Sequence, residues 1–310
     1  MIADAGKRYT LVPEETIPSK AKSVKPFTSF AKRSAQLAAG FICAVALVAG
    51  APTVAGAQVL TTDDICGKTA DARGITAENL PDIEATNAVV MGKDGTVYYA
   101  RSADDQVKIA SITKVMTAIL TVENCKMDEK ITVSNAAATV GNSTAGLLEG
   151  DELTVEQALR GLMIPSGNDA AIALACHTAG SVAAFAGMMN DKARALGMTS
   201  SAFQNPNGLD AEGHYSTARD MAKLACAALE NETFRAIVST KSTTVDGQTL
   251  VNHNRLLRSY DGAVGVKTGY TKTAGRTLVS CAQRGTTQFV CVTLSDPDDC
   301  CLLYTSPSPR

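Results

Sequence analysis

Several residue types are scarce in this chain of 310 residues, and each shortage excludes a class of function. Tryptophan is absent and aromatic residues make up only 5%, so stacking platforms for nucleic-acid bases are not expected. The 29 Lys and Arg residues nearly balance 31 Asp and Glu, and a formal net charge of −2 leaves no electrostatic footprint for nucleic acid. Hydrophobic residues at 45% nevertheless indicate a folded, globular protein.

Metal-binding patterns are lacking as well. The nine cysteines include no C-x-x-C pair, and no H-E-x-x-H spacing connects the three histidines His177, His214 and His253. We therefore expect neither a metal site nor a cofactor. Apolar surroundings at Cys176, Cys281 and Cys291 favour free, buried thiols over disulfides.

The N-terminal segment has the character of a leader that directs export. Lys32 and Arg33 precede an apolar run from Leu37 to Ala49, which is short for a membrane-spanning helix. The small residues Ala55-Gly56-Ala57 then match a signal-peptidase cleavage site, so we expect residues 1–57 to be removed. An uncleaved membrane anchor is the alternative, and in both cases the rest of the chain is exported.

The last residues differ in character from the rest of the chain. The sequence Cys301-Leu302-Leu303-Tyr304-Thr305-Ser306 is one translation of a transposon end used in sequencing libraries. We therefore expect 300–310 to be an adapter-derived tail and the natural domain to be truncated near Asp299. A native tail rich in proline and serine is the alternative.

The remaining chain divides into a polar, turn-rich lead-in over 58–84 and one domain over 85–299. Its periodicity predicts strands at both ends and helices between them, which indicates an α+β fold with one mixed sheet carrying a helical insertion. Thr154-Val155-Glu156-Gln157 supplies a capping-like start for the helical stretch, and Ser216 is a plausible N-cap of the last long helix. The expected elements are strands 88–91 and 96–99, helices beginning near 111 and covering 168–178, 182–196 and 217–229, and strands 264–268, 277–282 and 288–294.

Three short motifs carry the chemistry: Ser111-Ile112-Thr113-Lys114, Ser166-Gly167-Asn168 and Lys267-Thr268-Gly269. The S-x-x-K spacing also occurs at Ser19–Lys22 and Ser29–Lys32, but there it lies in the leader and is accidental. Only the Ser111–Lys114 pair follows a predicted hairpin and lies at the start of an apolar helix. In a helix, residues three positions apart lie on the same face, so the hydroxyl and the amine would be neighbours.

Each motif has a structural explanation when it is taken alone. Ser111 could cap a helix, Asn168 could cap the next one, and Lys267 could be an exposed strand lysine. Their joint occurrence, in this order and in these predicted elements, is typical of enzymes with a serine nucleophile. His253, which has no evident partner, is expected not to be catalytic.

A serine hydroxyl needs a base to become a nucleophile, and no histidine accompanies Ser111 in the sequence. Lys114 is the available base. A free lysine with a pKa near 10.4 is neutral in only about one molecule in 2,500 at pH 7. We therefore expect partial burial and a second cation, Lys267, to lower the pKa of Lys114.

With these motifs the chain resembles the serine D-alanyl-D-alanine carboxypeptidases, which are low-molecular-mass penicillin-binding proteins. The resemblance extends from about Ala88 to Asp299. It implies a β-lactamase/transpeptidase-like fold, in which an antiparallel sheet is flanked by helices and carries a helical subdomain. The segments that carry it, besides the three motifs, are Pro165–Ala171, Met189-Asn190, Ala195–Met198, Phe203–Leu209, Tyr215–Asp220 and Gly265–Thr271.

The resemblance implies removal of the terminal D-alanine from peptidoglycan stem peptides through an acyl-enzyme on Ser111, with β-lactams as covalent inhibitors. Lys114 and Ser166 are then expected to move protons. The residues expected to bind substrate are Asn168, Lys267, Thr268, Gly269 and Tyr270. The backbone N–H groups of Ser111 and Tyr270 are implied to form the oxyanion hole.

Two other functions share parts of this pattern. A class A β-lactamase needs a glutamate in an E-x-x-L-N setting to activate the deacylating water, and no such pentapeptide occurs here. A non-enzymatic penicillin sensor is disfavoured by the single N-terminal apolar segment. The turn Pro206-Asn207-Gly208-Leu209 is expected to be structural, with Gly208 in an unusual backbone conformation.

Overall fold

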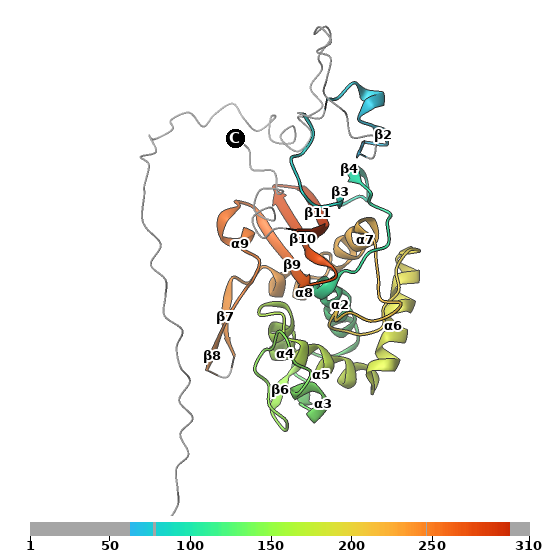
Figure 1. Ribbon diagram of the computed structural model, residues 1–310. Helices are drawn as coiled ribbons and strands as arrows, with labels where there is room; N and C mark the ends of the chain where they lie inside the picture. Colours follow the sequence, from blue (N-terminus) through green and yellow to red (C-terminus); the bar gives the residue numbers. More distant parts are fainter. Residues whose placement is uncertain (1–62, 77–78, 246, 298–310) are drawn as a thin grey trace, which may run out of the picture.

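A computed structural model describes residues 63–76, 79–245 and 247–297. The expected leader and the expected tail therefore lie outside the described residues. A seven-stranded sheet with the order β2-β1-β4-β3-β11-β10-β9 forms one side of the molecule (Figure 1). Its strands are β1 (Asp63–Ile65), β2 (Lys68–Thr69), β3 (Asn87–Gly92), β4 (Val97–Arg101), β9 (Ala263–Thr271), β10 (Gly275–Arg284) and β11 (Thr287–Asp296).

Every strand pairing in this sheet is antiparallel. The expectation of a mixed sheet was therefore wrong, while the antiparallel sheet implied by the family resemblance is confirmed. The first hairpin and the last three strands lie where the sequence placed them. They meet through β3 and β11, where Val90 lies opposite Cys291 and Val292 opposite Val89.

The polar lead-in contains regular structure that the sequence did not reveal. Its β1 pairs with β4 at the edge of the sheet. Asp63 in β1 is fully buried and accepts hydrogen bonds from Arg101 Nε at 2.8 Å and the Tyr99 hydroxyl at 2.8 Å. A buried carboxylate needs such partners, so these hydrogen bonds, together with the buried side chain of Ile65, fix this short strand on the sheet.

Alternating residues of β11 bury one face of the sheet against helices. Val290, Val292 and Leu294 are fully buried, and β11 and β3 pack against α7 while β9 packs against α8. The described helices are α2 (Lys114–Asn124), α3 (Asn135–Ala138), α4 (Val155–Met163), α5 (Asn168–Ala179), α6 (Val182–Ala195), α7 (Ala218–Ala228), α8 (Glu232–Val238) and α9 (Leu256–Ser259).

Helix α2 is central to the fold: it packs against α4, α5 and α6 on one side and against α7, α8 and β9 on the other (Figure 1). Its residues from Lys114 to Thr121 are all buried. A short 3-10 turn, η4 (Ala110–Thr113), precedes it and contacts β9 and β10. The start of α2 therefore lies where the helical subdomain meets the sheet.

Of the two helix caps expected from the sequence, one is found and the other is shifted by one residue. Thr154 and Gln157 form a reciprocal capping box at α4, as their spacing predicted. The N-cap of α7 is Thr217, whose side chain accepts from the Asp220 N–H, and not Ser216. The Ser216 hydroxyl instead contacts Ser201 Oγ at 2.7 Å, so a tertiary hydrogen bond replaces the expected local one.

The smaller elements are two two-stranded sheets and a turn. They are β5 (Lys130–Thr132) with β6 (Glu152–Thr154), β7 (Ser242–Val245) with β8 (Gln248–Val251), and the 3-10 turn η2 (Asp71–Arg73). All six cysteines in the described part of the chain are free thiols, but of the three expected to be buried only Cys281 is fully so, while Cys176 and Cys291 are partly buried. Within the same residues no single helix is long and apolar enough to span a membrane, and α5 and α6 reach that length only together across an 83° bend.

Gly208 allows a close contact with the turn that carries Ser111. Its φ is +85°, as expected for this turn, and a Cβ built on it would lie 1.9 Å from the carbonyl oxygen of Ala110. Both the left-handed conformation and the missing side chain are therefore required. A backbone oxygen cannot move aside as a flexible side chain would, so this contact fixes the 205–209 loop against η4.

We predict that Gly208→Ala lowers the free energy of unfolding by about 2–5 kcal/mol, the sum of a left-handed residue and an overpacked contact. Gly197→Ala is the matched control, because Gly197 has φ +66° but no atom lies within 4 Å of the position that its Cβ would take. It should lose only about 1–2 kcal/mol. Urea unfolding of both variants measures the difference, and equal losses would contradict the steric argument.

Candidate active site

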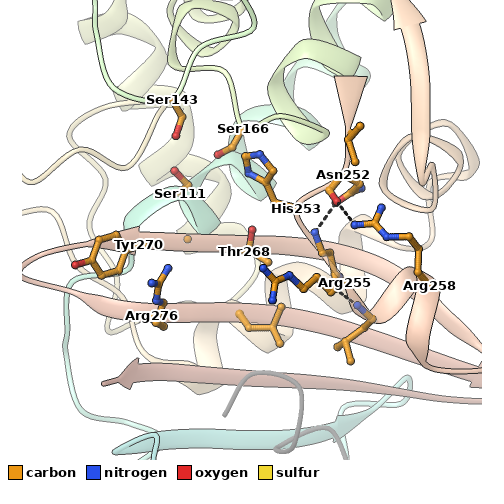
Figure 2. Close-up of a pocket in the computed structure, with 15 residues that line it drawn as sticks. Ser111, Ser143, Ser166, Asn252, His253, Arg255, Arg258, Thr268, Tyr270 and Arg276 are labelled. Atoms are coloured by element: carbon orange, nitrogen blue, oxygen red, sulfur yellow. Dashed lines mark hydrogen bonds between the residues drawn. The ribbon is translucent and has the colours of Figure 1, made fainter. Parts of the chain in front are cut away.

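The three sequence motifs converge on one pocket between the helical subdomain and strand β9. Five of the expected site residues line this pocket (Figure 2): Ser111, Ser166, Thr268, Gly269 and Tyr270. The other three, Lys114, Asn168 and Lys267, are at most 2% exposed. The fold thus brings together residues from the starts of α2 and α5 and from β9, as the motifs predicted.

The amine of Lys114 has a hydrogen-bond partner for each of its three protons. Its Nζ lies 2.9 Å from Ser111 Oγ, 2.8 Å from Asn168 Oδ1 and 2.7 Å from the carbonyl oxygen of Asn207. The last two are pure acceptors. When the amine is neutral, its two N–H bonds remain with Asn168 and Asn207, so its lone pair faces the Ser111 hydroxyl.

Burial favours this neutral state. The pKa of Lys114 lies well below its usual range, first because the amine is desolvated and second because the positive charge of Lys267 opposes protonation, while Asp169 acts the other way. Burial also lowers the pKa of Lys267 to about 7. The structure thus contains both features that were expected to lower the pKa of Lys114: the amine is buried, and Lys267 lies close enough for its charge to act on it.

Strand β9 lies directly against the turn that carries Ser111. A Cβ on Gly269 would lie 2.8 Å from the backbone nitrogen of Ser111, so only glycine fits here without displacing backbone. The Thr277 hydroxyl, on the neighbouring strand β10, donates to the carbonyl oxygen of Ile109 at 3.1 Å. Together these contacts fix the nucleophile's turn on the sheet.

Two residues of the site have left-handed backbone conformations although neither is glycine. Ala110, just before the serine, has φ +49°, and Ser166 has φ +67°. Such conformations are costly for residues with a side chain and concentrate at functional sites. The neighbouring N–H of Asn168 donates to the Ser143 carbonyl at 2.8 Å, which holds the turn of Ser166 in place.

Asn168 and its neighbour organise the opposite wall. The Asn168 amide donates to the Gly141 carbonyl at 3.0 Å while its oxygen accepts from Lys114. The buried Asp169 carboxylate accepts from Thr144 Oγ1 and from the backbone N–H groups of Ala145 and Leu147. These bonds hold the segment that brings Ser143 to the pocket.

Several lining residues were not found from the sequence. Ser143 lies in no motif, and His253, for which no role was expected, also lines the pocket together with Arg255, Arg258 and Arg276 (Figure 2). The pKa of His253 is lowered by burial and by the charge of Lys267. We call Arg255, Arg258 and Arg276 the basic rim. No local sequence spacing predicts it, because these residues come from the loop after β8, from α9 and from β10.

Tyr270 forms the outer edge of the pocket. Tyr270 is 54% exposed and carries the Arg276 guanidinium over the face of its ring, 4.3 Å from the ring centre. This cation–π contact holds a positive charge beside Tyr270. Among the described residues that line the pocket there is no aspartate or glutamate.

A buried histidine supports the loop that holds Lys114. Nδ1 of His214 accepts from the Gln204 N–H at 3.0 Å, and its Nε2 lies 2.9 Å from Thr113 Oγ1. Because Nδ1 is an acceptor, the ring is neutral with its proton on Nε2. Thr117 Oγ1 donates to the Pro206 carbonyl at 2.6 Å, so the 203–209 segment is tied to η4 and α2 at several points.

The chain is similar to known proteins in both sequence and fold. The family model for D-alanyl-D-alanine carboxypeptidase matches residues 74–298. The chain is 40% identical to the D-alanyl-D-alanine carboxypeptidase DacF of Bacillus subtilis over 220 residues, which cover 67% of this chain and 57% of that protein. A D-alanyl-D-alanine carboxypeptidase of Streptomyces is 39% identical over 255 residues, covering 74% of this chain and 88% of that protein.

Solved structures show the same fold. The crystal structure of a Streptomyces DD-transpeptidase aligns with a TM-score of 0.70 and 36% identity, covering 73% of this chain and 95% of that one. The D-alanyl-D-alanine carboxypeptidase DacD from Francisella tularensis aligns with a TM-score of 0.68 and 28% identity, covering 72% and 69% of the two chains. The transpeptidase-like fold expected from the sequence is therefore confirmed.

We predict that His214 makes the protein less stable in mild acid. Burial, followed by the charge of Lys108, lowers the pKa of His214 to about 4 from an ordinary 6.5. In the unfolded chain His214 therefore binds a proton below about pH 6.5, whereas in the folded protein it becomes protonated only near pH 4. Stability present above pH 6.5 is lost as the pH falls, by about 2 kcal/mol between pH 7 and pH 5.

Urea unfolding at pH 7 and pH 5 measures this loss, with His214→Gln as the comparison. The variant should be less stable at pH 7 but should show a smaller drop between the two pH values. An unchanged drop would assign the acid sensitivity to other groups.

Proposed function

The chain belongs to the D-alanyl-D-alanine carboxypeptidase family, and on this premise we propose that it removes the terminal D-alanine from peptidoglycan stem peptides through an acyl-enzyme on Ser111. The chain spans 57% of the length of the Bacillus subtilis relative, so the activity of the whole relative is extended to it as a proposal. The observation that carries the proposal is the 2.9 Å contact between Ser111 Oγ and a buried lysine amine.

In the proposed acylation step, the neutral Lys114 amine accepts the proton of Ser111, and Oγ attacks the carbonyl carbon of the penultimate D-alanine. The oxyanion that forms accepts hydrogen bonds from the backbone N–H groups of Ser111 and Tyr270. The C–N bond then breaks as the proton held by Lys114 is passed through Ser166 to the nitrogen of the departing D-alanine. Water then hydrolyses the ester and restores the serine.

Substrate binding is proposed to rest on opposite charge. Lys267 and Thr268 would hold the terminal carboxylate, Gly269 allows the substrate backbone to lie along β9, and Asn168 would bond the peptide from the opposite wall. The basic rim formed by Arg255, Arg258 and Arg276 supports a peptide with further carboxylates. A pocket without acidic lining residues among those described suits such a ligand.

Two alternatives were left open by the motifs. A class A β-lactamase needs a carboxylate to activate the deacylating water, and none is found among the described lining residues. β-Lactams are therefore proposed to acylate Ser111 and to leave slowly. A penicillin sensor would be acylated too, but it would release no D-alanine from a peptide.

The protein is proposed to act outside the cytoplasm, on the cell wall or as a secreted enzyme. This rests on the leader-like residues 1–57 and on a substrate class found in the cell envelope. Residues 85–299 are proposed as the catalytic domain, and the N-terminal segment, if uncleaved, would hold it at the membrane.

The function is tested by measuring D-alanine release from a D-Ala-D-Ala peptide beside the lifetime of the penicillin adduct. We predict release together with an adduct that persists much longer than one turnover, and loss of both signals in Ser111→Ala. The reason is that no other described serine lies within hydrogen-bond distance of a buried lysine amine. Penicillin labelling retained by Ser111→Ala, read by mass spectrometry, would reject Ser111 as nucleophile.

A second prediction separates the two proposed effects of Lys267. If its ammonium holds the substrate carboxylate, Lys267→Ala should reduce kcat/KM for peptides with a free C-terminus by at least about tenfold more than for amidated peptides, since a charged hydrogen bond contributes about 1.5–3 kcal/mol. Comparing both peptides on both proteins gives the ratio. Equal losses on the two peptides would instead mean that Lys267 acts mainly on the pKa of Lys114.

A further inference from the structure

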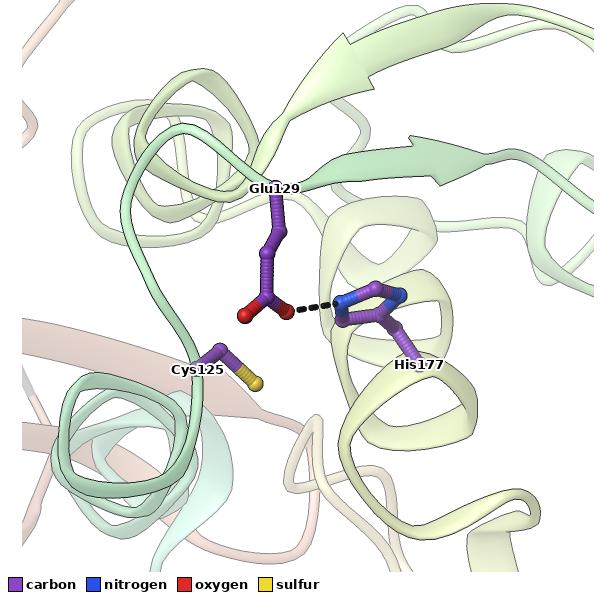
Figure 3. A group of neighbouring side chains, drawn as sticks. All are labelled: Cys125, Glu129 and His177. Atoms are coloured by element: carbon purple, nitrogen blue, oxygen red, sulfur yellow. Dashed lines mark hydrogen bonds and ion pairs between the residues drawn. The ribbon is translucent and has the colours of Figure 1, made fainter.

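A second group of reactive side chains lies at the opposite end of α2 from Lys114. Cys125, Glu129 and His177 each offer one potential metal ligand, and the three ligand atoms all lie within 4.8 Å of one another (Figure 3). The 11 residues of α2 put this group about 15 Å from the catalytic amine. It therefore takes no part in the proposed reaction.

Three separate pieces of the fold bring these side chains together. Helix α2 ends at Asn124, and Cys125 follows in an extended conformation. A short turn then brings Glu129 back, with its Oε1 accepting from the Lys126 N–H at 3.0 Å. His177 lies in the last turn of α5, and its Nε2 is 3.0 Å from Glu129 Oε2.

The arrangement fits a zinc ion in both size and chemistry. Tetrahedral zinc has bonds of about 2.3 Å to sulfur and about 2.0–2.2 Å to nitrogen and oxygen, so its ligand atoms lie about 3.3–3.7 Å apart. The 3.0 Å separation of His177 and Glu129 and the 4.8 Å limit for the group differ from this range by about 1 Å or less. Rotation of partly exposed side chains can provide that movement.

The set of ligands also selects the type of metal. A thiolate and an imidazole favour zinc and similar transition metals, whereas magnesium and calcium prefer oxygen alone. The thiolate and the carboxylate together balance the two positive charges of the ion. With three protein ligands, the fourth position is left for water.

We propose that Cys125, Glu129 and His177 form a binding site for a divalent transition metal, with zinc as the best fit. The metal joins the end of α2 to the end of α5. The starts of the same two helices carry Lys114 and Asn168, whose side chains are hydrogen-bonded at 2.8 Å. The ion would thus link the C-terminal ends of α2 and α5, the two helices whose N-terminal ends carry Lys114 and Asn168.

No metal was expected from the sequence, and the reason is the spacing of the three residues. Cys125 and Glu129 are close in the chain, but His177 belongs to a helix 48 positions further on, so no short motif connects them. Only the packing of α2 against α5 unites them. This site is independent of the proposed enzymatic function.

Zinc binding to the full chain, freed of metal with a chelator, tests the proposal by calorimetry and by the thermal midpoint. We expect one zinc ion per chain at this site and a higher midpoint with zinc. Cys125→Ser and His177→Ala should each weaken binding at least about tenfold, because even indirect partners of metal ligands cost about 10–100-fold when removed. Both should also lose the zinc-dependent rise in midpoint.

Cys66→Ser is the matched thiol control, since Cys66 is exposed and lies in a different part of the fold. Its zinc affinity should equal that of the unaltered chain. Cobalt provides a second readout, because a cobalt–thiolate bond absorbs in the near ultraviolet. This band should be lost in Cys125→Ser even at saturating cobalt and should be retained in Cys66→Ser. Circular dichroism establishes that each variant is folded, and Glu129→Gln replaces any variant that is not.

Thiols outside the described residues, such as Cys300 and Cys301, can also bind zinc, so the difference between variants decides the question. Unchanged affinity in Cys125→Ser and His177→Ala would overturn the proposal, as would an unaltered chain that binds no zinc. In either case the contact between His177 and Glu129 is only a hydrogen-bonded surface pair. D-alanine release is not part of this readout, so its outcome is separate from that of the proposed function.

Discussion

The burial of one amine, that of Lys114, is the constraint on which the site depends. Moving an ammonium ion out of water costs several kcal/mol, so the group must either pair with many acceptors or lose its proton. Here it does both: three oxygens surround Nζ, and burial lowers its pKa well below the usual range. Lys114 can therefore act as a base in place of a histidine, provided that the fold buries its amine and supplies the acceptors around it.

Much of the surrounding structure can be understood as support for that environment. The Asn207 carbonyl reaches Lys114 because Gly208 allows the 205–209 loop to contact Ala110. The neutral ring of His214 also holds this segment, through its hydrogen bond with the Gln204 N–H. Asn168 is held by the segment that Asp169 organises. Because these contacts share partners, a change in one is expected to disturb the others.

Local charge in the pocket contrasts with the chain as a whole. A net charge of −2 predicts no preference for anions, yet three arginines meet at the pocket rim without an acidic lining residue among those described. Composition averages over the surface, whereas a ligand meets only the charges that the fold gathers around it. The group formed by Cys125, Glu129 and His177 is a second case, in which scattered residues become neighbours at the ends of packed helices.

The sequence by itself determined the local features: the strands around the Gly92–Gly95 turn, the capping box at Thr154, and the three motifs with their order. These follow from spacings of a few residues, which helix and strand geometry translate directly into shared faces. Tertiary structure decided the rest, including the pairing of β1 through Asp63 and the two carbonyl acceptors of Lys114 on Asn168 and Asn207. Each depends on partners dozens of residues apart, whose meeting is set by packing and by the need to satisfy buried polar groups.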